Sequence, residues 1–137
     1  MTKKLLAAFC AIALLVMMLP YTVGAVDIVP YESEVIATTQ LYLSSSNGKV
    51  YADATIKTKA TASKLGFSSI TLYQKIDGVW MVAASATQKY LNNDSRYDYS
   101  VSCTLVSGRE YKASCKTYAI VNGQSDTSSA SAGPRTF

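Results

Sequence analysis

Side chains that could act as a nucleophile and its base stand in few combinations in this sequence. Histidine is absent, which excludes the Ser-His and Cys-His pairs in which an imidazole takes the proton of the nucleophile. One serine–lysine pair occurs at Ser46 and Lys49, around an Asn-Gly step that is typical of a hairpin turn. A lysine in such a turn stays hydrated and charged, so it is a poor base. We interpret this pair as turn chemistry.

Paired carboxylates, as in glycoside hydrolysis, are the other catalytic option. Asp94 and Asp98 lie close in sequence with Arg96 between them, which favours a solvated charge cluster over a general acid and base. Asp53 alternates with apolar residues and is expected at a solvent-facing strand position. The sequence therefore predicts no catalytic residue. We interpret the chain as non-enzymatic, with a hydrolase as the less favoured alternative.

Three cysteines are present. Cys10 falls in an apolar N-terminal segment, and Cys103 and Cys115 remain in the body of the chain. Two cysteines in an exported protein typically pair, so we predict one disulfide between them. Two buried free thiols are the alternative. Two thiolates without histidine do not complete a tetrahedral shell, and we therefore predict no metal and no cofactor.

Tyrosine is frequent, with ten in the chain. Strand alternation that turns Ile70, Leu72 and Tyr111 inward places other tyrosines and several lysines on one outer face. These candidate binding residues are Tyr73, Lys75, Lys112, Lys116 and Tyr118. The β-propensity of tyrosine would explain the composition without a site. As a binding face, the rings would stack on sugars or anchor a protein, and the lysines would favour an acidic partner.

The elements that position these residues are short strands with period-2 alternation. They are expected at 34–43, 50–56, 67–76, 79–85, 97–105 and 111–121, with a serine-rich edge strand at 124–132. The segments 57–66 and 86–96 are expected to be a polar loop and an irregular connection. Six or seven antiparallel strands with turns every eight to twelve residues predict an all-β sandwich, and a closed barrel is the alternative.

The N-terminus is typical of a secretory signal peptide. Lys3 and Lys4 precede an apolar run from Leu5 to Leu19, which is shorter than the ~20 residues that a spanning helix needs. We expect a signal-peptide helix at 1–25 with cleavage after Ala25, a lead-in at 26–33, the sandwich domain at 34–132 and a flexible tail at 133–137. An uncleaved anchor is the alternative. The expected location is extracellular, without stable membrane insertion after cleavage.

The charge balance excludes one class of partner. Loss of Lys3 and Lys4 lowers the net charge from +4 to about +2. Nucleic-acid-binding domains carry clustered lysine and arginine, so no nucleic-acid partner is predicted.

The spacing Leu105-x-x-Gly108-x-x-Tyr111, followed by Gly123 and Ser125, resembles the end of a fibronectin type III or immunoglobulin-like domain. The resemblance implies that Tyr111 is the tyrosine of a structural corner and that Leu105 packs against it. The whole chain, with its signal peptide, Ile70 and Leu72, Gly78-Val79-Trp80 and the run from Ser107 to Tyr111, resembles a family of small secreted Firmicutes proteins. That family has no known function.

We therefore predict a secreted, non-enzymatic β-sandwich module that binds a partner at or outside the cell envelope. A cell-wall polysaccharide and an extracellular protein are the partners considered. A secreted structural or effector protein is the alternative function.

Overall fold

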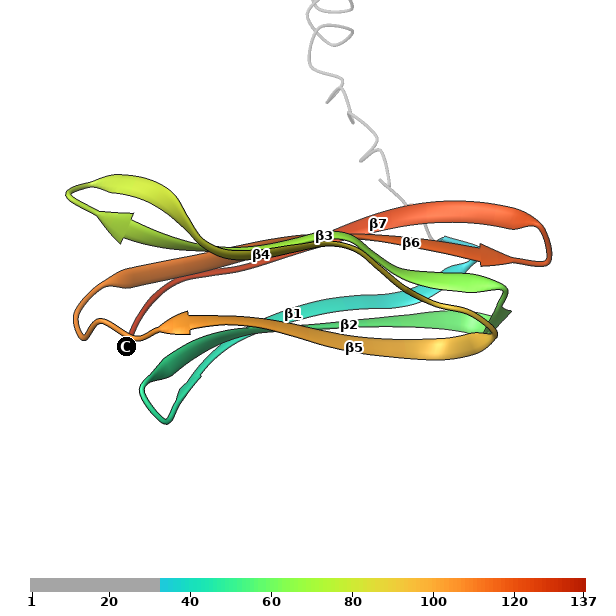
Figure 1. Cartoon of the computed structure of the whole chain (residues 1–137). Coiled ribbons are helices and arrows are strands. Elements are labelled where there is room, and N and C mark those ends of the chain that lie inside the picture. The colour runs from blue at the N-terminus through green and yellow to red at the C-terminus, as the bar shows by residue number, and fades with distance from the viewer. Residues whose placement is uncertain (1–32) are drawn as a thin grey trace, which may run out of the picture. The chain divides into compact units, whose positions relative to one another are not determined.

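Antiparallel β-strands make up nearly all of the part of the chain that is described. The computed structural model describes residues 33–137, and these contain no helix. The strands are β1 (Ile36–Ser46), β2 (Lys49–Ala62), β3 (Lys64–Ile76), β4 (Val79–Leu91), β5 (Asp94–Thr104), β6 (Glu110–Val121) and β7 (Gln124–Thr136). Figure 1 shows that they run along one long axis.

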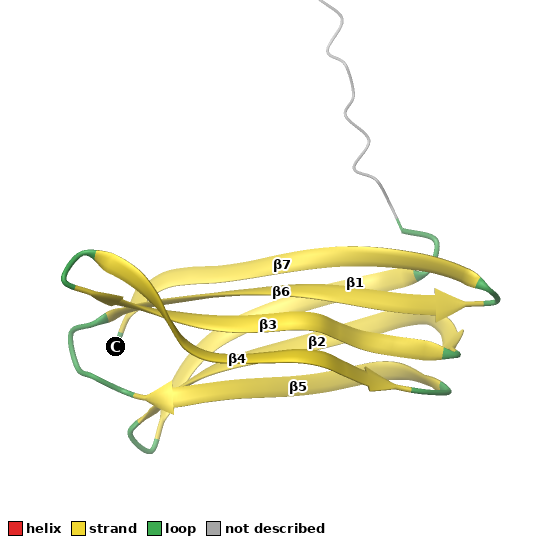
Figure 2. Ribbon diagram, turned by 45° about the horizontal axis from the view of Figure 1, so that its top comes forward, coloured by secondary structure: helices red, strands yellow, loops and turns green. Residues whose placement is uncertain are grey.

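The strands form two sheets that face each other (Figures 1 and 2). One sheet has three strands in the order β1-β2-β5, and the other has four in the order β4-β3-β6-β7. All five strand pairings are antiparallel. The prediction of an all-β fold of six or seven antiparallel strands in two layers is confirmed, with seven strands observed. Two separate sheets replace the alternative of a closed barrel.

Strict alternation on β2 builds one wall of the core. Val50, Ala52, Ala54 and Ile56 are at most 1% exposed, as their period-2 spacing predicts. The opposite wall is larger, with Phe67, Ile70, Leu72 and other side chains of β3 and β6 fully or nearly buried. Small side chains on β2 facing large ones on β3 allow the two sheets to pack closely.

Two segments expected as irregular are strands. Residues 57–66 form the end of β2 and the start of β3, and residues 86–96 form the end of β4 and the start of β5. Buried and exposed side chains do not alternate regularly in these segments, because strand pairing is interrupted there. In the β2–β5 pair the register shifts between Lys57 and Ala62. Alternation along 34–43 predicts Ala37 on the same inward face as Val35 and Leu41. A register shift in β1, between Ile36 and Thr38, leaves Ala37 exposed instead.

The chain end is also more ordered than the flexible tail expected at 133–137. β7 continues to Thr136 and pairs with β6 as far as Glu110. The carbonyl of Phe137 accepts a hydrogen bond of 3.0 Å from the amide of Gly108, and the Phe137 ring lies 6.2 Å from the ring of Tyr111. An aromatic partner and a backbone hydrogen bond hold this segment in place. The sequence did not predict this, because the Gly133-Pro134 step is typical of a loose tail.

The expected signal peptide at 1–25 and nearly all of the lead-in at 26–33 lie outside the described residues. Within residues 33–137, no helix is long and apolar enough to cross a membrane.

Candidate functional site

The outer face of the four-stranded sheet carries the predicted binding residues. On β6 the side chains of Tyr111, Ala113 and Cys115 are buried, and the residues between them point away from the core. Tyr73 of β3 lies opposite Lys112 in the ladder. The face holds Tyr73, Lys75, Lys112, Lys116 and Tyr118. We call it the lysine–aromatic face.

Two of its lysines gather around a tryptophan at one end of the face. The Lys112 ammonium lies 4.5 Å from the centre of the Trp80 ring and 5.5 Å from that of Tyr73. The Lys75 ammonium lies 5.6 Å from the Trp80 ring and 3.3 Å from the carboxylate of Glu110. These five residues from β3, β4 and β6 form what we call the hairpin cluster.

A second cluster lies at the other end of the face. Tyr90 and Tyr118 meet edge-on, with ring centres 6.2 Å apart. The ammonium of Lys64 lies 4.3 Å from the Tyr90 ring and 5.9 Å from the Tyr118 ring. Tyr90 and Tyr118 are the two cross-strand partners of Gly66, whose missing side chain leaves room between them. We call these three side chains the far cluster.

A strip of small hydroxyl residues separates the two clusters. Lys116 stands in this strip, opposite Ser69 on β3 and Ser129 on β7. The strip also includes Thr71, Ser85, Ser114 and Ser131. From Lys112 to Tyr118 the strand rises by roughly 20 Å. The face is therefore long, with an aromatic and cationic group at each end and a lysine between them.

Both clusters place lysine ammonium groups over ring faces. Such contacts contribute about 0.5–1 kcal/mol at exposed sites, whereas the Lys75–Glu110 ion pair, with 39% and 44% of its side chains exposed, adds little because water screens it. The rings restrict the lysines while leaving them in contact with solvent. An anion arriving at this face would meet positive charges that are already positioned.

No family model, curated protein or solved structure matches this chain. The resemblance to secreted Firmicutes proteins stays a prediction.

The predicted disulfide is wrong, because Cys103 and Cys115 are both free thiols. They belong to different sheets, Cys103 on β5 and Cys115 on β6. Tyr111 reaches Thr104, the neighbour of Cys103, with its hydroxyl, and Cys115 lies four residues further along β6. That is roughly 13 Å of strand, too far for a bridge whose Cα atoms must lie within about 7 Å. Spacing in the sequence did not reveal this offset.

Labelling with iodoacetamide should show both thiols free. Burial raises the pKa of the thiols of Cys103 and Cys115, and the thiolate is the reactive form. We expect alkylation of folded protein to be at least about tenfold slower than of unfolded protein, with Cys115 the slower because it is only 2% exposed. Peptide mass spectrometry without reductant measures both rates. A linked Cys103–Cys115 peptide pair would contradict this expectation.

The residues assigned to a structural corner lie together. The Tyr111 hydroxyl accepts a hydrogen bond of 2.9 Å from the amide of Val106 and lies 3.5 Å from the carbonyl of Thr104. Leu105 is partly buried against the core, and Gly108 takes a positive φ of 81° in the connection to β6. The tyrosine is fully buried, so its role is to fix this connection.

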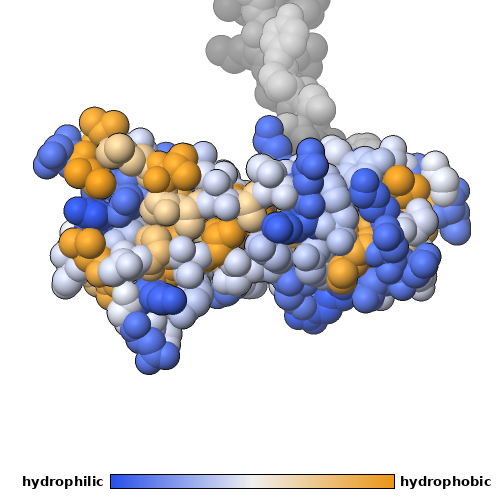
Figure 3. All heavy atoms as spheres, in the orientation of Figure 1, coloured by the Kyte–Doolittle hydropathy of each residue, from blue (hydrophilic) through white to orange (hydrophobic). Residues whose placement is uncertain are grey.

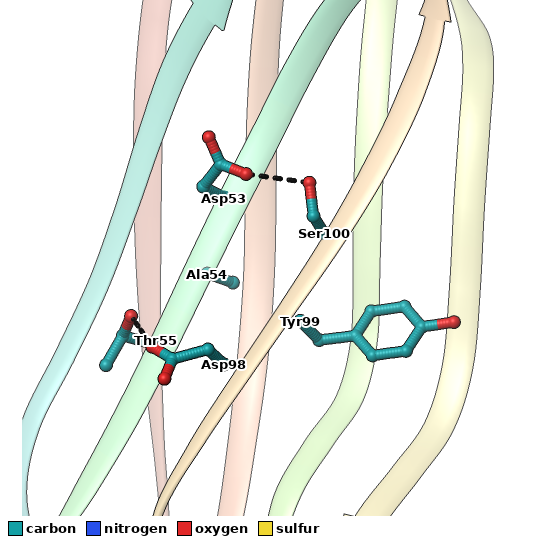
Figure 4. Close-up of a pocket in the computed structure, with 6 residues that line it drawn as sticks. All are labelled: Asp53, Ala54, Thr55, Asp98, Tyr99 and Ser100. Carbon is teal, nitrogen blue, oxygen red and sulfur yellow. Dashed lines mark hydrogen bonds between the residues drawn. The ribbon is translucent and has the colours of Figure 1, made fainter.

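The carboxylates weighed as catalytic residues lie on the outer face of the three-stranded sheet and bind neighbouring side chains. Asp53 accepts a hydrogen bond of 2.7 Å from Ser100, and Asp98 accepts one from Thr55 (Figure 4). Two hydrogen bonds from Arg96 to Asp98 are the main reason why the pKa of this carboxyl is lowered. A shallow hollow of about 180 Å³ lies between the two carboxylates.

This hollow has no feature of a general acid. Asp94, the first residue of β5, accepts hydrogen bonds from the backbone amides of Ser95 and Arg96. The Asp98 carboxylate is held ionised beside Arg96, whereas a general acid needs a raised pKa. Among residues 33–137, no group of three or more His, Cys, Asp or Glu side chains could hold a metal ion.

Sequence reasoning missed several members of the face. The sequence predicts Trp80 on the strand at 79–85 but does not indicate that it belongs to the face. The two-residue turn at Asp77-Gly78 fixes the pairing of Lys75 with Trp80 and was a sufficient signal for it. Lys64 and Tyr90 were missed because their segments were expected to be irregular.

Proposed function

We propose that this chain is a secreted, non-enzymatic binding module whose lysine–aromatic face binds an extended acidic partner outside the cell. The observation that carries the proposal is the position of Lys112, whose ammonium lies over the rings of both Trp80 and Tyr73. Lys64 repeats the arrangement with two tyrosines at the other end of the face.

The fold supports a binding role of the kind that immunoglobulin-like domains have. The strand order β1-β2-β5 and β4-β3-β6-β7 is that expected of a fibronectin type III sandwich. The hydroxyl of Tyr111 bonds to backbone upstream of β6, as a tyrosine corner does. We infer that the chain belongs to this class of sandwich. Such a scaffold holds side chains on a rigid sheet, which lowers the entropy lost on binding.

The placement of the lysines favours an acidic partner over a neutral sugar. A sugar that stacked on Trp80 or Tyr90 would have to displace the ammonium of Lys112 or Lys64 from the ring. An anionic group can instead contact these ammonium groups where they stand. Within residues 33–137, Lys75 is the one lysine of the face that has a carboxylate partner, Glu110. The face therefore presents an excess of positive charge.

The length of the face favours a polymer. Its two cationic clusters lie roughly 20 Å apart along the strands, with Lys116 between them, so one small anion cannot contact both. An anionic cell-wall polysaccharide would contact all three positions at once. An acidic segment of an extracellular protein is the second candidate, because the same charges would attract it.

Binding to purified anionic cell-wall polysaccharide tests the proposal. In isothermal titration calorimetry the double variant Lys112→Gln/Lys116→Gln should bind roughly tenfold more weakly, because two exposed charges contribute about 0.5–1 kcal/mol each. Affinity should also fall as the salt concentration is raised from about 0.05 M to about 0.5 M, because salt screens the attraction between exposed charges.

The matched control is Lys57→Gln, which removes an exposed lysine from the three-stranded sheet and should leave the affinity unchanged. A loss of binding free energy for Lys57→Gln that is half that of the double variant would mean that only net charge matters, because the control removes one charge and the double variant removes two. Absence of binding to anionic polysaccharides and acidic proteins would instead favour the structural or effector alternative.

A further inference from the structure

Exposed apolar side chains gather at one end of the described domain. Among residues 33–137 the large hydrophobic side chains with the greatest exposure include Val79, Met81 and Val82 of β4, at 61%, 51% and 59%. Val106, in the loop between β5 and β6, is 42% exposed. Figure 3 shows hydrophobic atoms concentrated at the left end, where Figure 1 places the β3–β4 hairpin and this loop.

The β3–β4 hairpin is apolar on both of its faces. Val82 lies opposite Tyr73 and Trp80 opposite Lys75, on the outer side. Val79 and Met81 alternate with them, on the side that elsewhere packs against the three-stranded sheet. Figure 1 shows that the β3–β4 and β1–β2 hairpins diverge at this end. The exposed fractions of Val79 and Met81 show that the described residues cover the inner side of the tip only in part. We call residues 79–82 the apolar tip.

Positively charged side chains lie on one side of the apolar tip. Lys75 and Lys112 stand beside Trp80, and Arg109 donates a hydrogen bond of 2.9 Å to Gln74 on the same hairpin. Lys49 lies at the same end, next to Gly48, whose carbonyl bonds to Leu105. Asp77 and Glu110 are the opposing carboxylates. The balance at this end of the domain is positive.

We propose that the apolar tip docks reversibly onto an anionic lipid surface. The hairpin carries apolar side chains on both faces. Lipid can contact both faces at once, whereas a protein partner would cover one face. Tryptophan favours the interface between water and lipid, and Trp80 lies within the tip. Lysines next to the tip can extend their ammonium groups to lipid headgroups while their stems lie along apolar surface.

Asp77 limits the depth of docking. It sits in the turn at the very end of the hairpin, with a positive φ of 50°, and an ionised carboxylate is costly to place among lipid chains. The hairpin therefore lies along the surface with Asp77 in the headgroup layer. Removing this charge with Asp77→Asn should strengthen docking several-fold.

Trp80 reports docking directly because it is the only tryptophan of the chain. With vesicles that contain an anionic phospholipid, its emission should shift to shorter wavelength, and lipids with brominated chains should quench it. Vesicles of phosphatidylcholine alone should give at least about tenfold weaker binding, since each basic residue near an anionic surface adds attraction. Polysaccharide binding along the sheet cannot produce quenching by lipid chains, so this test is independent of the proposed function.

The test variant is Val79→Ser/Met81→Ser, and its matched control is Leu91→Ser at the opposite end of the same strand, 37% exposed. With folding checked by circular dichroism, the tip variant should lose at least about tenfold in vesicle affinity, and the control should lose little. Unchanged Trp80 emission with anionic vesicles would overturn the proposal. So would a dimer in sedimentation velocity that the tip variant abolishes, because a second copy would then cover the tip.

Discussion

Gly66→Ala is expected to destabilise the protein by about 3 kcal/mol or more, a large part of the 5–15 kcal/mol typical of a domain. Gly66 lies in the central strand β3, between Tyr90 of β4 and Tyr118 of β6. A Cβ there would stand 2.0 Å from the carbonyl oxygen of Lys89 and 2.8 Å from the Cα of Tyr90. Both are backbone atoms of β4, so no rotamer change relieves the clash. The strand itself must move.

Urea unfolding of folded variants measures this loss, with Gly123→Ala as the control. Gly123 also has a positive φ, 76°, but nothing lies within 4 Å of its added Cβ. Its cost is therefore only that of the left-handed backbone, about 1 kcal/mol. If both variants lost the same amount, the close approach of β4 to β3 at Gly66 would be wrong. The far cluster, which needs Tyr90 and Tyr118 side by side, would then be wrong with it.

The sequence predicts those strands of the sandwich that have one buried and one solvated face. β2 is the clearest case, since Val50 to Ile56 alternate without a break and all four apolar side chains are buried. The end of β4 has no such pattern: Thr87 and Gln88 are both exposed, and Gln88 takes a positive φ of 51°. A strand whose side chains are exposed on both faces leaves no period in the sequence.

For the lysine–aromatic face, too, the sequence predicts some features and not others. Alternation along β6 is enough to place Lys112, Lys116 and Tyr118 outward, because each follows a buried residue. Which ring each lysine meets depends on cross-strand register, and the β3–β4 register shifts between Leu72 and Tyr73. A bulge is not visible in hydrophobic periodicity. The partners of Lys64 could therefore not be predicted, whereas the turn at Asp77-Gly78 would have given that of Lys75.

The disulfide fails for a related reason. Cys103 and Cys115 both occupy inward positions, which alternation predicts, but their offset along the strands depends on how the two sheets are placed against each other. Tyr111 sets that placement by reaching from β6 to the backbone at the end of β5. The number of residues between the two cysteines does not determine how far apart they lie along the facing strands β5 and β6.

Replacing Tyr111 by alanine is the second change expected to have a large effect, a loss of about 4 kcal/mol in unfolding free energy. Its side chain is the largest of those fully buried among residues 33–137, and its ring packs against that of Phe137. Tyr111→Phe keeps the ring and removes the hydroxyl, leaving the Val106 amide without its partner. That smaller change should cost about 1–3 kcal/mol.

Thermal and urea unfolding measure both losses, and Tyr51→Phe is the control. Tyr51 points outward on β2, is only partly buried, and its hydroxyl should contribute little. Loss of the Tyr111 ring should also free the Phe137 end of the chain, so hydrogen exchange at the Gly108 amide, which bonds to Phe137, should speed up in Tyr111→Ala before global unfolding. Equal stability of Tyr111→Phe and Tyr51→Phe would mean that the hydroxyl does not fix the connection into β6. The positions of Lys112 and Lys116 on that strand would then depend on the sheet ladder alone.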